Sequence, residues 1–232
     1  MAISGGVLAT IGHTPVARLG KLVGPGMAEV VVKLEGANPT GSYKDRMALA
    51  MIEGAERSGR LRPGQTVVEY TGGSTGSSLA FVCALKGYPL RIVSADAFAE
   101  EKILTMRAFG ATVEVLRSPD GITPQLIPRL MARAREIVAE TGGYATDQFN
   151  NRDMVDGYLA LGHELAEQVD GRLDVFCAYV GTGGCFLGAC QGLRERIPEV
   201  RRVVIEPEES AVISGRPAGA HRSRGLDGAA EE

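Results

Sequence analysis

The chain has 232 residues, of which 44% are hydrophobic and 23% charged, so it is long and apolar enough to fold around a sizeable core. Its formal net charge of −3 gives no basic field for nucleic acid, and its apolar runs are far shorter than the ~20 residues that span a bilayer. The first residues lack the basic stretch of a secretory signal. We therefore expect a cytoplasmic protein that binds neither nucleic acid nor membrane.

Short β-branched runs of strand length alternate with longer stretches of helical period along most of the chain. The predicted strands are residues 66–70, 90–95, 112–116, 175–180 and 202–206. The predicted helices begin near residue 42 and cover 76–87, 99–110, 127–138, 153–169 and the residues after 184. This alternation is typical of right-handed βαβ units, which indicates an α/β fold with parallel sheets and helices on both faces. A break near residues 144–153 indicates two lobes.

The four cysteines and three histidines are too dispersed to predict a metal site. Cys185 and Cys190 are five residues apart, which matches neither a CxxC pair nor neighbouring positions on one helix face. Cys83 and Cys177 lie in apolar runs and are predicted to be buried as small hydrophobic side chains. We expect reduced thiols and no bound metal.

Two glycine-rich loops directly follow predicted strands, at the end of a parallel sheet where ligands bind. They are TGGSTGSS at residues 71–78 and GTGGCFLG at residues 181–188. Each loop combines glycines with hydroxyl groups and precedes a predicted helix, and such loops bind phosphate or carboxylate groups through backbone N–H groups. The alternative is a tight strand-to-helix turn that needs glycine for its own backbone geometry.

The second loop departs from the known nucleotide-binding patterns. Glu206 ends the following strand, where a ribose-binding acid would lie, but a G-x-G-x-x-G pattern begun at Gly181 requires glycine in place of Phe186. The P-loop pattern does not occur in the sequence. A single phosphate group therefore suits this loop better than a pyrophosphate.

The segment NPTGSYKDRM, residues 38–47, places Lys44 at the start of a predicted helix. Ser42 and Asp45 form a capping-box pattern, and an apolar stripe begins at Met47. The helix macrodipole disfavours another positive charge there, so we expect a lowered pKa for Lys44, as in a nucleophilic amine that binds an aldehyde cofactor. The alternative is an exposed lysine paired with Asp45. A reactive lysine, a phosphate loop and a hydroxyl-rich loop together are what pyridoxal phosphate needs.

In these motifs the chain resembles the cysteine synthase (O-acetylserine sulfhydrylase) family of fold type II pyridoxal-phosphate enzymes. The similarity runs in family order through IGHTPVARL, NPTGSYKDRM, YTGGSTGSSLAF, KILTMRAFGATV, DQFNN, YVGTGGCFLG, VVIEPEES and GAHRSRGLDG. It implies two three-layer αβα lobes with parallel sheets, as in the tryptophan synthase β fold. The smaller lobe would hold residues 1–12 and 35–145, and the larger lobe residues 13–34 and 146–232.

The resemblance also implies a role for each motif. Lys44 would be the catalytic residue, holding pyridoxal 5'-phosphate as a Schiff base and shuttling the α-proton. The other cofactor-binding residues would be Ser74 at the ring hydroxyl and, at the phosphate, Gly181, Thr182, Gly183, Gly184 and Cys185. The substrate carboxylate would bind to Thr71, Gly72, Thr75 and Gln148. The implied reaction, in a homodimer, is elimination from an activated serine such as O-acetylserine, followed by addition of a nucleophile such as sulfide.

Three departures from the family pattern bear on this function. Ser74 stands where the family has an asparagine, and Gly72 where it has a serine, so the choice of amino-acid substrate stays open. The family chain continues well beyond GLDG and there supplies a hydroxyl at the pyridine nitrogen, so we expect a C-terminally truncated member, less stable and weakly active. The alternatives to β-replacement are a serine or threonine dehydratase or lyase of the same fold, and a truncated, non-catalytic cofactor-binding protein.

Overall fold

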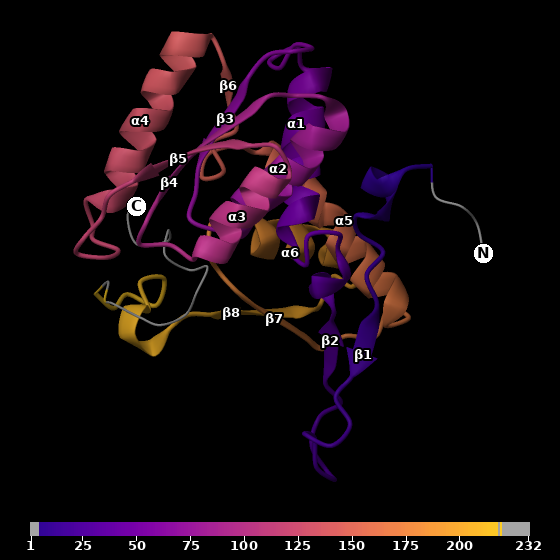
Figure 1. Cartoon of the computed structure of the whole chain (residues 1–232). Coiled ribbons are helices and arrows are strands. Elements are labelled where there is room, and N and C mark those ends of the chain that lie inside the picture. The colour runs from indigo at the N-terminus through magenta and orange to yellow at the C-terminus, as the bar shows by residue number, and fades with distance from the viewer. Residues whose placement is uncertain (1–4, 218, 220–232) are drawn as a thin grey trace.

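A four-stranded parallel sheet lies at the centre of the computed structural model, which describes residues 5–217 and residue 219. The strands, in the spatial order β5-β4-β3-β6, are β3 (Val67–Tyr70), β4 (Leu90–Ala95), β5 (Thr112–Leu116) and β6 (Tyr144–Ala145). The helices around it are α1 (Lys44–Arg57), α2 (Ser74–Lys86), α3 (Glu100–Ala108) and α4 (Leu126–Thr141). Helix α4 covers one face of the sheet, and α1, α2 and α3 lie on the other (Figure 1).

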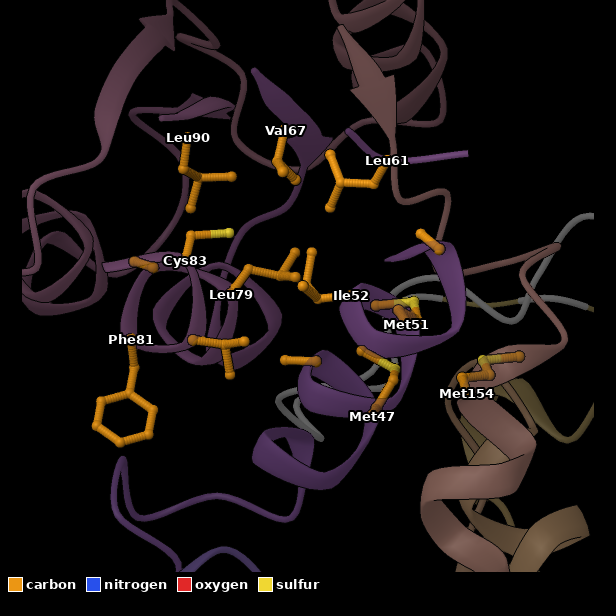
Figure 2. Close-up of a cluster of buried hydrophobic side chains, with 14 of the residues drawn as sticks. Met47, Met51, Ile52, Leu61, Val67, Leu79, Phe81, Cys83, Leu90 and Met154 are labelled. Carbon is orange, nitrogen blue, oxygen red and sulfur yellow. The ribbon is translucent and has the colours of Figure 1, made fainter. Parts of the chain in front are cut away.

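Successive residues of β3 and β4 face opposite sides of the sheet, as the two-residue period of a strand requires. Val67 and Ile92 pack into a buried cluster with side chains of α1 and α2. Figure 2 shows part of this cluster, including Val67. Val68 and Val93 pack into a second cluster with Leu130 and other apolar side chains of α4. Burial of each such side chain contributes roughly 1.5–3 kcal/mol. The two clusters therefore fix the sheet and the loops that leave its carboxyl end.

The second group of elements follows β6 in the chain. It consists of α5 (Asp153–Gln168), β7 (Val175–Tyr179), α6 (Gly184–Arg196) and β8 (Arg201–Ile205), with β7 and β8 parallel. Helices α5 and α6 touch through glycine, because a Cβ atom on Gly162 would lie 2.7 Å from the backbone nitrogen of Leu193. Helix α5 also packs against α1, which joins this group to the four-stranded sheet.

An antiparallel hairpin precedes the parallel elements and was not predicted from the sequence. Its strands are β1 (Val16–Arg18) and β2 (Val31–Lys33). Short 3₁₀ turns occur elsewhere in the described residues, at η1 (Val7–Thr10), η2 (Glu35–Ala37) and η3 (Glu208–Ser210). The hairpin lies beside α5 (Figure 1), where the Lys33 amine is 2.8 Å from the carboxylate of Glu164. Strands of three residues are too short for an alternating pattern to show.

A buried ion cluster ties the start of the chain to α1 and α5. The Arg46 guanidinium, in a residue only 4% exposed, donates from Nε to Glu35 at 2.7 Å and from Nη1 to Glu164 at 2.7 Å. Although burial by itself raises the pKa of Glu164, hydrogen bonds from Arg46 and Lys33 outweigh it and hold that pKa at about 2. The pKa of Glu35 is lowered in the same way. Two charged carboxylates thus hold α1, whose first residue is Lys44.

The α/β class with parallel sheets is confirmed, and the predicted strands and helices lie within a few residues of their expected bounds. Two details were wrong. Cys177 was predicted to be buried but is exposed on β7. Asp45 makes no capping box with Ser42, because its carboxylate accepts hydrogen bonds from the backbone nitrogen and hydroxyl of Thr40, at 2.8 and 2.5 Å. The lobe boundaries stay a prediction, and nearly all of GAHRSRGLDG lies outside the described residues.

No helix within the described ranges is long and apolar enough to cross a membrane. Across the same part of the chain, no three His, Cys, Asp or Glu side chains gather as a metal-binding group. The four cysteines carry free thiols, and burial raises the pKa of Cys83 and Cys185 to about 12.

Candidate functional site

A cavity of about 840 Å³ lies at the carboxyl ends of the parallel strands, where the loops after β3, β4, β6 and β7 meet the start of α1. The predicted site residues that line it are Lys44, Thr71, Gly72, Ser74, Thr75, Gln148, Gly181 and Thr182. Gly183, Gly184 and Cys185 follow directly and form the start of α6. The fold therefore brings the lysine and both glycine-rich loops to one cavity.

Lys44 is the first residue of α1 and is only 9% exposed. Its backbone N–H donates to the hydroxyl of Ser42 at 3.1 Å, and its amine lies 5.2 Å from the centroid of the Tyr43 ring. Burial lowers the pKa of the Lys44 amine, against smaller opposing effects of Cys185 and Glu69. The predicted direction is right, but its main cause is desolvation. The alternative of an exposed lysine is wrong.

The loop after β3 turns directly into α2, with Gly73 as the residue before the helix. The hydroxyl of Thr75, which is 4% exposed, donates to the side-chain oxygen of Gln148 at 2.7 Å. Thr71 is 6% exposed, and its hydroxyl accepts from the N–H of Gly73 at 3.2 Å. Since the oxygen of Gln148 is already bonded, its amide N–H₂ group is left to donate to an anion in the cavity.

The loop after β7 has the geometry of an anion-binding turn. Gly183 has φ 81°, a left-handed backbone conformation that other residues rarely adopt, and a Cβ atom there would meet nothing within 4 Å. Helix α6 starts at the next residue and is 13 residues long. Its first N–H groups, which lack intrahelical partners, suit a phosphate. The side chain of Cys185 packs against the core cluster formed with α1 and α2.

Several apolar lining residues were missed by the sequence analysis. They are Phe98, Ile122, Ile127, Phe149 and Tyr179. Phe98 lies on the loop after β4, beside the loop after β3, and a Cβ atom on Gly72 would lie within 2.5 Å of three atoms of its ring. The Phe98 ring therefore fills the space that a side chain at position 72 would need. The one signal in the sequence that could have identified Phe98 was its position directly after β4, the parallel strand next to β3.

Glu206 does not act as a ribose-binding acid in the described structure. Its carboxylate accepts from the backbone nitrogens of Ile213 and Ser214, at 2.7 and 3.0 Å, and from the Ser214 hydroxyl at 2.7 Å. These bonds close the turn that follows η3. This agrees with the missing dinucleotide pattern.

Comparison with known proteins gives a consistent result. Residues 7–228 match the family described as pyridoxal-phosphate dependent enzyme. The chain is 42% identical over 218 residues to a cysteine synthase of Staphylococcus aureus (strain Mu50), covering 93% of this chain and 69% of that protein. The structure of a cysteine synthase from Entamoeba histolytica matches with a TM-score of 0.90 and 30% identity, covering 99% of this chain and 68% of the other. A hydrogen sulfide-producing enzyme from Fusobacterium nucleatum matches with a TM-score of 0.85 and 32% identity, covering 95% and 72%.

Proposed function

We propose that this protein converts O-acetylserine and sulfide to cysteine. The chain belongs to the pyridoxal-phosphate dependent enzyme family and is cysteine synthase-like. The observation that carries the proposal is the shared cavity, into which a buried lysine, a hydroxyl-rich loop and an anion-binding turn all open. In the overall reaction the C–O bond to acetate breaks, a C–S bond to sulfide forms, and acetate leaves with the bonding electron pair.

The residues present fit pyridoxal phosphate. The Lys44 amine would hold the cofactor aldehyde, and the backbone of residues 181–185 would hold its phosphate, where Gly183 leaves the approach open. Ser74, the first residue of α2, would contact the ring hydroxyl. When bound, the cofactor supplies an electron sink for the substrate α-carbon, which makes removal of its proton and of the β-substituent possible.

The protein side chains supply orientation and proton transfer. Thr71, Thr75 and the free amide group of Gln148 would bind the substrate carboxylate and so fix the α-carbon above the base. Lys44 would remove and return the α-proton, because burial increases the neutral fraction of its amine near pH 7. The apolar wall with Phe98 and Phe149 limits water around the reacting atoms.

A second candidate is elimination without addition, which would release hydrogen sulfide from a sulfur amino acid. The similarity to the hydrogen sulfide-producing enzyme favours it, as does Gly72, which offers one hydroxyl fewer to the substrate carboxylate than a serine. Supplying cysteine alone and assaying for pyruvate separates the two, because only elimination without addition forms pyruvate, whereas sulfide is released from cysteine in either reaction.

We also expect a cytoplasmic homodimer. Large apolar side chains on the β1–β2 hairpin support an interface between copies, since Leu22 is 83% and Met27 70% exposed. The four free thiols are in keeping with a reducing compartment. Light scattering of the purified protein measures the mass, and cell fractionation tests the location.

The central experiment is turnover by the cofactor-loaded protein. Incubation with O-acetylserine and sulfide should yield cysteine, and Lys44→Ala should abolish the product while leaving the fold intact. Lys102→Ala is a matched control, because Lys102 is a second lysine that lines the same cavity. Absence of cysteine from the wild type, with pyruvate formed instead, would favour the second candidate.

A further inference from the structure

Glu69 is a buried carboxylate next to the cavity that no part of the proposed mechanism uses. It is the third residue of β3 and is 1% exposed. Acidic side chains are rarely buried so completely without a cation. Within the described chain Glu69 has no ion pair, and its hydrogen-bond donors are the neutral groups of Thr146, Tyr70 and Gln148.

Two of these donors belong to the segment that follows β6. The hydroxyl of Thr146 donates to Glu69 Oε2 at 2.7 Å, and the backbone nitrogen of Gln148 donates to the same oxygen at 3.2 Å. Asp147, between them, has φ 48°, a left-handed conformation that is strained for an aspartate. A strained backbone persists only where its neighbours hold it, and Glu69 binds the residues on both sides.

Gln148 is thus held at both ends. Glu69 fixes its backbone nitrogen, and Thr75 fixes its side-chain oxygen at 2.7 Å. Within the described residues its amide N–H₂ group has no hydrogen-bond acceptor, and Gln148 lines the cavity. The direction of that donor depends on both contacts.

We propose that Glu69 is a positioning residue, which holds Gln148 so that its amide donates to the carboxylate of the amino-acid substrate, and whose charge makes substrate binding depend on pH. The proposal rests on the proposed function, since it assumes an amino-acid carboxylate at Gln148.

The electrostatic surroundings support the pH dependence. The pKa of Glu69 is raised to about 7, because burial, aided by the nearby charge of Asp147, outweighs the hydrogen bonds from Thr146, Tyr70 and Gln148 that lower it. The other titratable groups that interact with it are Lys44 on α1, Tyr70 beside it and Tyr144 on β6. A substrate carboxylate near an ionised Glu69 is repelled, so the neutral form binds substrate more tightly. Affinity should fall as pH rises through about 7.

The test measures amino-acid binding by the cofactor-loaded protein from pH 6 to 8.5, together with KM and kcat. Glu69→Gln keeps the size of the side chain and removes its charge. At pH 6 its KM for O-acetylserine should rise roughly fivefold to tenfold, the loss of about one hydrogen bond, with kcat nearly unchanged. Its KM should no longer vary with pH near 7. Glu114→Gln, on β5 of the same sheet, is the matched control and should behave as wild type.

Thr146→Val is the second variant, because it removes one hydrogen bond to Glu69 and keeps the charge. Its KM should rise while the pH dependence is retained, and this result stands even if Glu69→Gln fails to fold. The proposal is overturned if the wild-type affinity does not change near pH 7, if Glu69→Gln keeps the wild-type pH profile, or if Thr146→Val leaves KM unchanged. Since binding is followed separately from turnover, a wild type that binds the amino acid without forming cysteine refutes the proposed reaction and still decides the role of Glu69.

Discussion

Replacing Gly72 with serine tests whether Phe98 and Gly72 form a matched pair in the cavity wall. The added Cβ atom would lie 2.5 Å from ring atoms of Phe98, whereas ordinary contacts are 3.4–4 Å, so the ring must move by about 1 Å. Overpacking of this kind costs roughly 1–3 kcal/mol. Phe98 is on a loop and only partly buried, so we expect the lower part of that range, about 1–2 kcal/mol. Thermal unfolding should then shift down by about 2–8 °C.

The displaced ring also gives the change a functional signature. Pushed away from Gly72, Phe98 narrows the cavity, so KM for the amino acid should rise although serine adds a hydroxyl to the carboxylate loop. The double variant Gly72→Ser with Phe98→Ala has no ring at position 98. Its free energy of unfolding should therefore be almost the same as that of Phe98→Ala alone. Unfolding curves and KM for the four proteins complete the cycle. A Gly72→Ser protein as stable as wild type, or a serine cost that persists without Phe98, would refute the pairing.

The remaining expectations concern the phosphate turn and the buried ion cluster. Gly183→Val should lower the free energy of unfolding by only about 1–2 kcal/mol, because valine must adopt the left-handed backbone of Gly183. It should weaken pyridoxal-phosphate binding far more. If denaturation and cofactor titration show equal losses of free energy, the loop is a plain turn. Arg46→Ala removes the cation that Glu35 and Glu164 share and leaves only Lys33 beside Glu164, so it should lower the free energy of unfolding in urea by roughly 3–5 kcal/mol. A loss below about 1 kcal/mol would contradict this expectation. Because the pKa of Glu164 is about 2 in the fold and 4.5 in the unfolded chain, its contribution is complete above pH 4.5 and lost as pH falls toward 2; the stability gap between wild type and Arg46→Ala should shrink over that window, and a constant gap would contradict this assignment.

The parts of the site that the sequence could predict are those encoded in short continuous segments. Lys44 and the two glycine-rich loops each combine a strand end, a turn and a helix start within about ten residues, and local pattern is enough to identify such units. The order of the elements then places them at one end of a parallel sheet. For this reason the cavity residues came together as expected.

The rest depends on contacts between distant segments. Glu69 stands in the apolar run VVEY, and its burial is tolerated only because β6, a strand of two residues, brings Thr146 and Gln148 beside it. A strand that short has no detectable period. In the same way Asp45 was expected to cap its own helix, but Thr40 competes for its carboxylate. The direction of the Lys44 pKa could be predicted, whereas its cause, burial, required the fold.

The most direct test of the account is to locate the lysine that carries the cofactor. The purified protein, loaded with pyridoxal phosphate, is reduced with borohydride, digested and analysed by mass spectrometry. We expect the label on the peptide that contains Lys44, and no labelling of Lys44→Ala under the same conditions. Lys33, a second buried lysine, serves as the internal control, because its amine is bonded to Glu164 and should stay unlabelled. Stoichiometric label on any lysine other than Lys44 would contradict the assignment of this cavity as the cofactor site.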